Sequence, residues 1–506
     1  MLCAVAVLAA APAPGALAQN RLPALGDSAT EDFGIGTERK LGDQIMREIR
    51  RDPDYLDDPV LLEYVQTMWN ALLAAARERG DLGADIDQRF AWEAFLVRDR
   101  SVNAFALPGG YVGVHLGLIA MTATRDELAS VLAHELTHVT QRHIARSIGN
   151  SRRQTLLSTA AMILGVLAAS RAHSADMASA AIAGGQAAAI QGQLNFSRDM
   201  EREADRIGLG VMTGAGFAPA GMAAMFEKLE HSARLNDSGG FPYLRSHPLT
   251  SERIGEARAR LGTAERAAPV SVLEHSLAQA RARVLMDARV DSLRRWQAQE
   301  AAAGASREDR MAVAYASALA STLLRDDARA DAAFGTLQAL LRDGPRDARA
   351  ARAVALLEAQ IALARNDVPR AEAAIAPHRG DGSRPVLLLD AHLALAHAGD
   401  APMRKRSADA LQTWVAAHPG DAEAWMLAGR LWHGLGEPLR SLRAEAEARL
   451  ALGDLNGAVD RLRAGQRSAR EGGRTDFIEL SVIDARLRDI EALRRELSDE
   501  ARKGGG

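Results

Sequence analysis

The chain has 506 residues, a net charge of −3 and 25% charged residues. This length exceeds what one compact core holds, so two or three domains are expected. The near-neutral charge argues against a general nucleic-acid-binding surface. Aromatic residues make up only 4% while alanine is abundant, which is typical of helices that pack closely through small side chains.

Residues 1–18 are predicted to be a secretory signal peptide, followed by an N-terminal extension over 19–35. The segment is a short apolar run that ends in the small-residue pattern of a cleavage site. Pro12 and Pro14 argue against the alternative, a buried first helix. The only cysteine, Cys3, lies inside this segment, so the mature chain is expected to have no disulfide and no thiol nucleophile.

The next part of the chain predicts helices and then a small sheet. Residues 36–79 repeat apolar positions at spacings of three and four, which is typical of helix. Three short stretches rich in aromatic and β-branched residues follow, and turn residues separate them. They are predicted to be strands over 90–97, 101–108 and 110–119.

A buried helix is predicted to begin near residue 125. Thr124 and Glu127 have the spacing of a capping box, in which each side chain caps a backbone N–H of the first turn. The apolar residues that follow form a stripe along one side. This helix contains the histidine segment LAHELTHVTQRH, residues 132–143.

His134, Glu135 and His138 form an H-E-x-x-H motif. Residues four apart on a helix share a face, so both imidazoles can bind one zinc ion, while Glu135 can take a proton from a water that the metal activates. Chance gives roughly 0.04 such matches in a chain of this composition when either acidic residue is allowed at the second position. The alternative is two surface histidines on an ordinary helix.

His143 is predicted not to be the third ligand. A different class of zinc protease has a glycine turn and five residues between its last two histidines. Here four residues without a glycine separate His138 from His143. On one continuous helix the two side chains would differ in direction by about 140°. His143 is therefore expected to cap, to pack or to lie at the surface.

The third ligand is expected on a second helix, predicted from about 197 to 212. Glu201 and Asp205 are four apart there and share a face. One carboxylate can bind zinc while the other accepts the N–H of a ligand imidazole. The alternative is a charged face in contact with solvent.

Two further segments leave alternatives open. The apolar stretches within 155–194 are predicted to form a core hairpin of helices, with a mobile lid or a membrane-touching flap as alternatives. Residues 266–304 are predicted to be linker helices. Residues 305–500 are predicted to be an all-α array of paired helices that resembles tetratricopeptide repeats, with a plain helical bundle as the alternative.

Three stretches in this order resemble the gluzincin peptidases of the HtpX and Ste type: NAFALPGGYVGVHLGLI, ELASVLAHELTHVTQRH and EREADRIG. With an export signal and a helical tail, the chain is similar to the periplasmic beta-barrel assembly-enhancing branch of these enzymes. The resemblance implies a zinc metalloprotease domain over 36–265. The expected fold class is mainly α with a small β-sheet, followed by the all-α array.

The resemblance also implies roles for the site residues. His134, His138 and Glu201 would bind one zinc ion per chain, and Asp205 would orient a ligand histidine. Glu135 would act as general base and then acid. The substrate would pair, as an added strand, with the edge strand formed by Asn103, Ala104, Phe105 and Ala106.

Two further residues have more than one possible role. His247 stands before Pro248, which favours an extended turn. The resemblance implies that it can fill the fourth position on zinc and hold the enzyme latent. It could instead polarise the substrate carbonyl or simply face water. Arg253 is a candidate for stabilising the oxyanion.

The sequence thus predicts a periplasmic zinc endopeptidase of a Gram-negative bacterium. By resemblance its substrates would be misfolded outer-membrane proteins, and its array would bind their assembly machinery, with peripheral membrane contact as a further possibility and no nucleic acid. The alternative from a different class is a chaperone or binding scaffold with a latent zinc site. A hydrolase of small molecules has little support, because an edge strand and a protein-binding tail both indicate polypeptide substrates.

Overall fold

The computed structural model describes residues 34–149, 197–235, 241–261, 272–397, 399–471 and 476–504. The predicted signal peptide and the apolar stretches within 155–194 lie outside these residues, and both stay predictions. The described part is mainly helical with one small sheet, which confirms the predicted fold class. Within the ranges given above, no helix combines the length and the apolar character needed to cross a bilayer.

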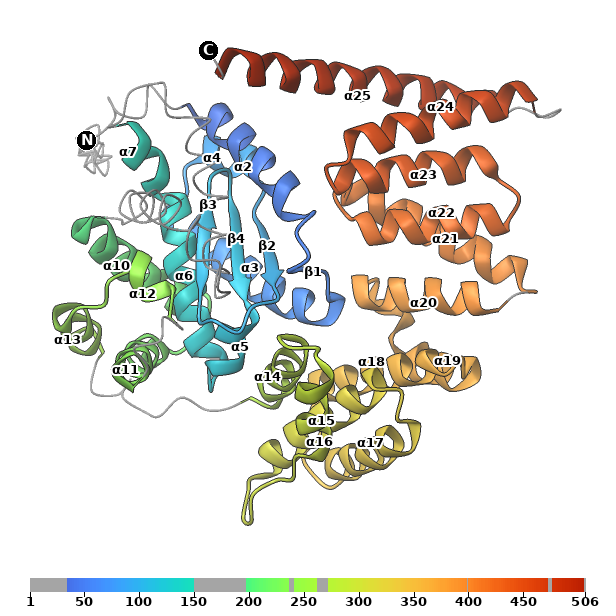
Figure 1. The fold of residues 1–506 in the computed structure, drawn as a ribbon. Helices are drawn as coiled ribbons and strands as arrows, with labels where there is room; N and C mark the ends of the chain where they lie inside the picture. The colour runs from blue at the N-terminus through green and yellow to red at the C-terminus, as the bar shows by residue number, and fades with distance from the viewer. Residues whose placement is uncertain are drawn as a thin grey trace, which may run out of the picture.

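The first half of the chain contains the sheet and the helices around it (Figure 1). Its elements are α2 (Ile35–Ile49), β1 (Tyr55–Leu56), α3 (Pro59–Arg79), α4 (Ala84–Arg89), β2 (Glu93–Val97), β3 (Ala104–Leu107), β4 (Tyr111–His115), α5 (Leu116–Met121), α6 (Arg125–Thr140), α7 (His143–Gly149), α10 (Arg198–Gly214), α11 (Ala220–Leu235), α12 (Tyr243–Ser246) and α13 (Ser251–Ala259). The strand predicted over 110–119 is wrong in its last part, because the chain turns into α5 at Leu116.

The four strands are arranged in the order β1-β2-β4-β3. β2 and β4 are parallel, whereas β1 and β3 run antiparallel to their neighbours. Because β3 is last in the order, it is an edge strand. Phe105 of β3 lies opposite Gly113 of β4. A Cβ atom on Gly113 would lie 2.4 Å from the Phe105 ring. The glycine therefore allows the edge strand to pair in this register.

The helix that carries the histidine segment, α6, is buried along nearly its whole length, from Asp126 to Thr140. It begins as predicted: the Thr124 hydroxyl accepts a hydrogen bond from the Glu127 backbone N–H at 3.2 Å. Glu127 in turn accepts the Ala123 N–H at 2.7 Å, which holds the first turn from both sides. α6 packs against α3, α10, α11 and the edge strand β3.

α10 crosses α6 in close contact at Gly208. A Cβ atom at that position would lie 3.1 Å from the Ala133 carbonyl oxygen and 3.2 Å from the His134 nitrogen. A larger residue would push the two helices apart next to His134, which lies in the middle of α6. The small residue therefore allows the side chains of α10 to reach the face of α6 that carries the histidines.

The second half of the described chain is all-helical, as predicted. Its elements are α14 (Leu273–Leu285), α15 (Val290–Ala298), α16 (Arg307–Leu323), α17 (Asp327–Arg342), α18 (Ala348–Ala364), α19 (Val368–Ile375), η3 (Ala376–Asp381), α20 (Arg384–Ala396), α21 (Ala401–Ala417), α22 (Ala422–Gly434), α23 (Pro438–Ala451), α24 (Leu455–Glu471) and α25 (Phe477–Gly504). Successive helices pack on each other around three apolar cores. The tetratricopeptide-like character and the domain boundaries stay predictions.

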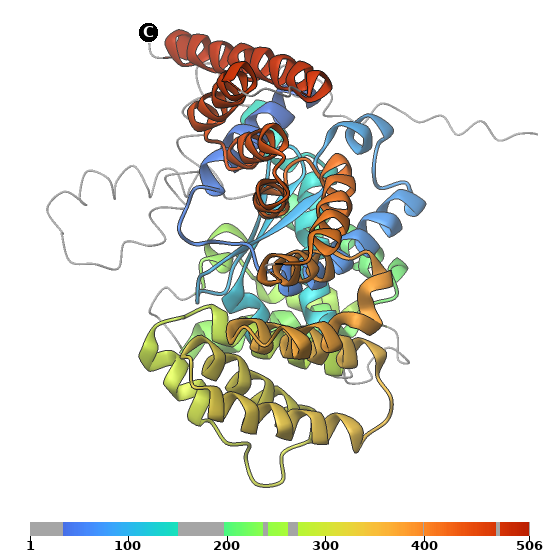
Figure 2. The ribbon, with the colours of Figure 1, turned by 90° about the vertical axis from the view of Figure 1, so that its right-hand side faces the viewer.

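The array folds back along the first half instead of extending away from it. Seen from the side of the array, the helices that follow α19 lie in front of the sheet (Figure 2). At the start of α3, three acidic side chains face arginines from three helices of the second half, α14, α18 and α20. The pairs are Asp58 with Arg281, Glu63 with Arg352 and Asp57 with Arg384.

The pair between Arg281 and Asp58 is the most buried of the three. Its side chains are 3% and 9% exposed, and both nitrogen–oxygen distances are 2.7 Å. Arg281 also donates to the Tyr315 hydroxyl at 3.1 Å and to Gln360 at 3.0 Å. One guanidinium thus links α14 to α3, α16 and α18.

We predict that Arg281→Met lowers the free energy of unfolding by about 3 kcal/mol, because it leaves the Asp58 carboxylate buried without its counter-charge. Urea denaturation checks this. Arg289→Met is the matched control: Arg289 also binds an aspartate, Asp287, but its side chain is 74% exposed, so a change within about 0.5 kcal/mol is expected. Equal effects of the two substitutions would contradict the assignment of Arg281 as a buried anchor.

Candidate metal centre

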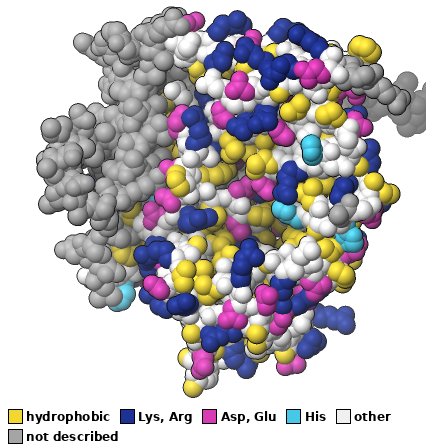
Figure 3. Space-filling view, turned by 45° about the vertical axis from the view of Figure 1, so that its right-hand side comes forward, with side chains coloured by type: hydrophobic (Ala, Val, Ile, Leu, Met, Phe, Trp, Pro, Cys, Tyr) yellow, Lys and Arg dark blue, Asp and Glu magenta, His cyan; other side chains and the backbone are white. Residues whose placement is uncertain are grey.

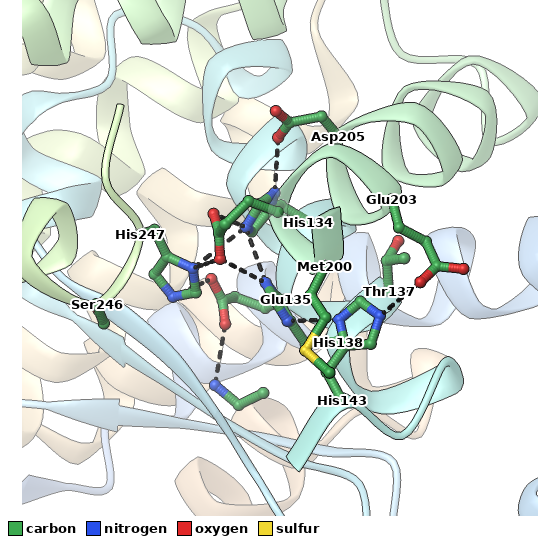
Figure 4. Close-up of polar contacts among 12 residues, drawn as sticks. His134, Glu135, Thr137, His138, His143, Met200, Glu203, Asp205, Ser246 and His247 are labelled. Atoms are coloured by element: carbon green, nitrogen blue, oxygen red, sulfur yellow. Dashed lines mark hydrogen bonds and ion pairs between the residues drawn. The ribbon is translucent and has the colours of Figure 1, made fainter. Parts of the chain in front are cut away.

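His134 and His138 face one another from successive turns of α6. Their Nε2 atoms are 3.0 Å apart, and both side chains are buried. Figure 4 shows the two rings pointing to the same side of the helix. The spacing of four in the sequence therefore produces the shared face that was predicted.

Glu201 approaches this pair from the first turn of α10. Ser197 caps that helix by accepting the Met200 N–H at 3.2 Å, which fixes where the helix begins. Glu201 Oε2 lies 3.5 Å from His134 Nε2, and Oε1 lies 3.5 Å from His138 Nε2. A carboxylate separated by about 60 residues of chain thus closes the third side of the cluster.

His247 completes the cluster from the turn after α12. Its Nδ1 lies 3.0 Å from Glu201 Oε1 and 3.3 Å from His134 Nε2. The ring packs against Tyr243, with ring centroids 4.7 Å apart. His247 is 2% exposed, so the alternative of a turn histidine that faces water does not describe this conformation.

These four side chains fit a zinc ion. One ligand atom from each of His134, His138, Glu201 and His247 lies within 4.8 Å of the other three. Neighbouring atoms are 3.0–3.5 Å apart, close to the roughly 3.3 Å edge of a tetrahedral site with ligand bonds of about 2.0–2.1 Å. Glu201 Oε2 is buried and accepts no well-formed hydrogen bond, although Arg253 Nη1 is 2.8 Å away.

Glu135 lies between the cluster and the edge strand. Its Oε2 accepts the backbone N–H of Ala106 at 3.0 Å, and Oε1 lies 3.5 Å from His247 Nε2. Oε1 is buried without a hydrogen-bond partner. Burial raises the pKa of this carboxyl, and the charges of His247 and His134 oppose that effect. The geometry leaves one carboxylate oxygen anchored and the other directed at the cluster.

Burial and neighbouring charges shift the pKa values of the cluster, and one histidine must lose a proton before it can bind a metal. Burial lowers the pKa of His138 well below its usual value, so this ring is neutral. Burial also lowers the pKa of His134, but the adjacent carboxylates of Asp205 and Glu201 outweigh it and raise the pKa to about 9. Burial raises the pKa of Glu201, but His247 and His134 outweigh it and keep the carboxylate ionised. Zinc requires neutral imidazoles, so it must displace the proton of His134.

The comparisons with known proteins agree with this chemistry. Residues 70–261 match the model of peptidase family M48. The chain is a zinc metalloendopeptidase with an M48 domain. Its four clustered side chains lie inside the matched range.

Two bacterial relatives extend the similarity beyond the M48 domain. The chain is 38% identical over 278 residues to the putative beta-barrel assembly-enhancing protease of Vibrio cholerae, which covers 54% of each protein. It is 29% identical over 472 residues to the beta-barrel assembly-enhancing protease of Escherichia coli K12, covering 93% of this chain and 91% of the relative. The similarity to the second relative therefore includes the helical array.

A third, eukaryotic relative matches a shorter part. The mitochondrial metalloendopeptidase OMA1 of Schizosaccharomyces pombe is 35% identical over 163 residues, which covers 32% of this chain and 44% of the relative. The alignment with OMA1 thus spans less than half of that protein. The alignment with the Vibrio cholerae protein spans about half of that relative.

In this peptidase, Asp205 and Arg253 hold His134 from behind. Asp205 Oδ1 lies 3.0 Å from His134 Nδ1, which directs Nε2 toward the cluster. The Arg253 guanidinium binds both oxygens of Asp205, at 2.6 and 2.8 Å, and donates to the Pro248 carbonyl at 2.9 Å. These contacts occupy Nε and both terminal nitrogens in this conformation, and the oxyanion role of Arg253 stays a prediction. We describe it as a positioning residue.

His143 is where the sequence reasoning missed a contact. The predicted difference of about 140° holds only on one continuous helix, but α6 ends at Thr140 and a new helix, α7, begins at His143. Arg142 between them has φ of +53°. The break turns His143 back onto α6, where it is fully buried with its Nδ1 2.9 Å from His138 Nδ1. Neither glycine nor proline marks the break in the sequence.

We predict that Asp205→Asn weakens zinc binding about tenfold to a hundredfold, because the amide holds neither the His134 ring nor the Arg253 charge as the carboxylate does. Competition against a chromogenic chelator measures the affinity. Asp199→Asn is the matched control on the same helix, with a side chain that is 93% exposed. Unchanged affinity in Asp205→Asn would show that His134 is positioned by other contacts.

Proposed function

We propose that this peptidase works in the periplasm and cleaves outer-membrane β-barrel proteins that have failed to fold or assemble. The observation that carries the proposal is the convergence of His134, His138 and Glu201 beside Glu135 and an edge strand. The predicted signal peptide and the names of the bacterial relatives support the location and the substrate class.

We assign the zinc ligands to His134, His138 and Glu201. When bound, zinc supplies a Lewis acid that polarises a water molecule and the scissile carbonyl. Glu135 is the general base: its free Oε1 accepts the proton of the attacking water, and the protonated carboxyl then donates to the leaving amine. The hydrogen bond from Ala106 to Oε2 holds the carboxylate in this orientation.

The edge strand β3 positions the substrate. Residues two apart in a strand point their backbone groups the same way, so Ala104 presents its N–H and C=O to the side on which Ala106 meets Glu135. An extended segment of substrate pairs with this edge and brings one carbonyl to the metal centre. Asn103 lies just before β3, and its carbonyl oxygen accepts the His115 N–H at 3.0 Å.

His247 keeps the resting enzyme latent. Its Nδ1 stands among the ligand atoms, and its Nε2 is beside the free oxygen of Glu135. Water and the scissile carbonyl need this same space, so His247 must leave before catalysis. Arg253 ties the turn to α10 through Pro248 and Glu201, which stabilises the closed arrangement.

The helical array provides the binding surface for the assembly machinery. Figure 3 shows a face of the molecule turned 45° toward the array from the view of Figure 1, on which side chains of both charge signs are interspersed with hydrophobic ones. This face therefore has no single dominant charge sign of the kind that marks a nucleic-acid-binding surface. A second candidate, a chaperone or scaffold with a latent zinc site, is favoured by the position of His247 alone.

Casein digestion by the mature chain tests the proposal. We expect slow cleavage by wild type and faster cleavage by His247→Ala, because removal of the imidazole opens the fourth position. Adding Glu135→Gln to His247→Ala is expected to reduce the rate at least about a hundredfold, since the amide cannot take the proton. A zinc chelator is expected to stop all cleavage.

His433→Ala is the matched control, since this histidine is exposed on α22 in the array; it should cleave as wild type does. Loss of activity in His247→Ala would contradict latency and make His247 a required ligand or catalytic residue. Cleavage that survives Glu135→Gln would contradict the general-base assignment. If a strain lacking the enzyme is fully rescued by Glu135→Gln, the scaffold function replaces the protease function.

A further inference from the structure

A second row of hydrogen-bonded side chains leads from the metal centre to the partly exposed Glu203. It begins at His138 Nδ1, which lies 2.9 Å from His143 Nδ1. His143 Nε2 lies 3.1 Å from Glu203 Oε2. The same Glu203 oxygen accepts from Arg146 Nη1 at 3.0 Å. Figure 4 shows His138, His143 and Glu203 in a row that leads away from the cluster.

The donor and acceptor pattern of this chain has one consistent assignment when His138 binds through Nε2. The His138 proton is then on Nδ1, and it is donated to His143 Nδ1, which must be the unprotonated nitrogen. The His143 proton is therefore on Nε2 and is donated to Glu203. Arg146 holds the Glu203 carboxylate ionised and in place. With this assignment each imidazole N–H in the row donates to an acceptor, and the Glu203 carboxylate accepts from both His143 and Arg146.

The contact between His138 and His143 depends on the backbone conformation at Arg142. The break between α6 and α7 runs through Arg142, whose φ of +53° is unfavourable for a residue with a side chain. Arg142 is held there by Glu38 of α2, which is 2% exposed and accepts from Nε at 2.9 Å. The Ser147 hydroxyl adds a hydrogen bond to the His143 carbonyl oxygen at 2.9 Å.

We propose that His143, backed by Glu203, is the positioning residue for the zinc ligand His138, as Asp205 is for His134. It fixes which ring nitrogen of His138 carries the proton and which way the ring faces. The two zinc histidines are thus oriented by two separate chains, one through a carboxylate and one through a second imidazole. This inference rests on the zinc site of the proposed function.

The direct test compares zinc affinity in two substitutions of His143, measured by chelator competition. His143→Leu removes the acceptor and is expected to weaken zinc binding about tenfold to a hundredfold. His143→Asn places an amide oxygen near the position of Nδ1, so it is expected to recover most of that loss. His433→Leu, at the exposed histidine of the array, is the matched control and should bind as wild type does.

A spectroscopic readout separates positioning from packing. Cobalt in place of zinc reports ligand geometry through its visible absorption, and we expect an altered spectrum in His143→Leu and a near wild-type one in His143→Asn. The melting temperature of the metal-free protein records any purely structural effect. If Leu and Asn weaken zinc binding equally, or if neither does, the proposal is overturned.

Two further measurements keep the test decisive. If His143→Leu does not fold, Glu203→Ala replaces it, because that side chain is 29% exposed; an unchanged zinc affinity and cobalt spectrum would overturn the proposal. The wild-type affinity separates the two levels of inference. If wild type binds no zinc, the site itself is wrong; if wild type binds tightly and His143→Leu does too, only the role of His143 is wrong.

Discussion

The structure depends on the convergence of three imidazoles and a carboxylate in a space closed to solvent. Ring nitrogens of His134 and His138 only 3.0 Å apart are unfavourable unless a cation or proton lies between them. The negative charge of Glu201 on α10 stabilises such a cation or proton, and the close contact at Gly208 allows α10 to approach α6. A zinc ion is the group that satisfies all of these atoms at once.

The two zinc-site histidines of α6, His134 and His138, are held by different kinds of contacts. His134 is held by Asp205, whose carboxylate is in turn bound by the buried Arg253. His138 is held by His143 and by a glutamate that is partly exposed. The peptidase thus has one rigid, buried support and one support that ends at the surface, and the His247 turn is attached to the rigid one through Arg253.

Local spacing explains why much of the site could be read from the sequence. Residues four apart share a helix face, so the pairs His134 with His138 and Glu201 with Asp205 were predictable from geometry alone. The strand predicted over 101–108 and the helical second half also followed from residue patterns, whereas the position of that strand at the sheet edge was implied by the family resemblance. Their roles as ligands and substrate contacts stay predictions, as do the domain boundaries.

What could not be read depends on tertiary contacts. The end of α6 is set by an unfavourable backbone conformation at Arg142 that Glu38 stabilises from another helix, and no local signal marks it. The partners of Arg253 come from α10 and from its own preceding turn, so its guanidinium could not be placed by spacing. The contacts of α3 with Arg281, Arg352 and Arg384 join segments more than 200 residues apart.

The central claim is that one zinc ion is bound where the four side chains meet. An anomalous difference map at the zinc absorption edge, from crystals of the mature chain, tests it most directly. We expect a single peak about 2.0–2.2 Å from His134 Nε2, His138 Nε2 and a Glu201 oxygen, with His247 Nδ1 in the fourth position of the resting enzyme. A peak elsewhere, or one that Glu201 does not contact, would contradict it.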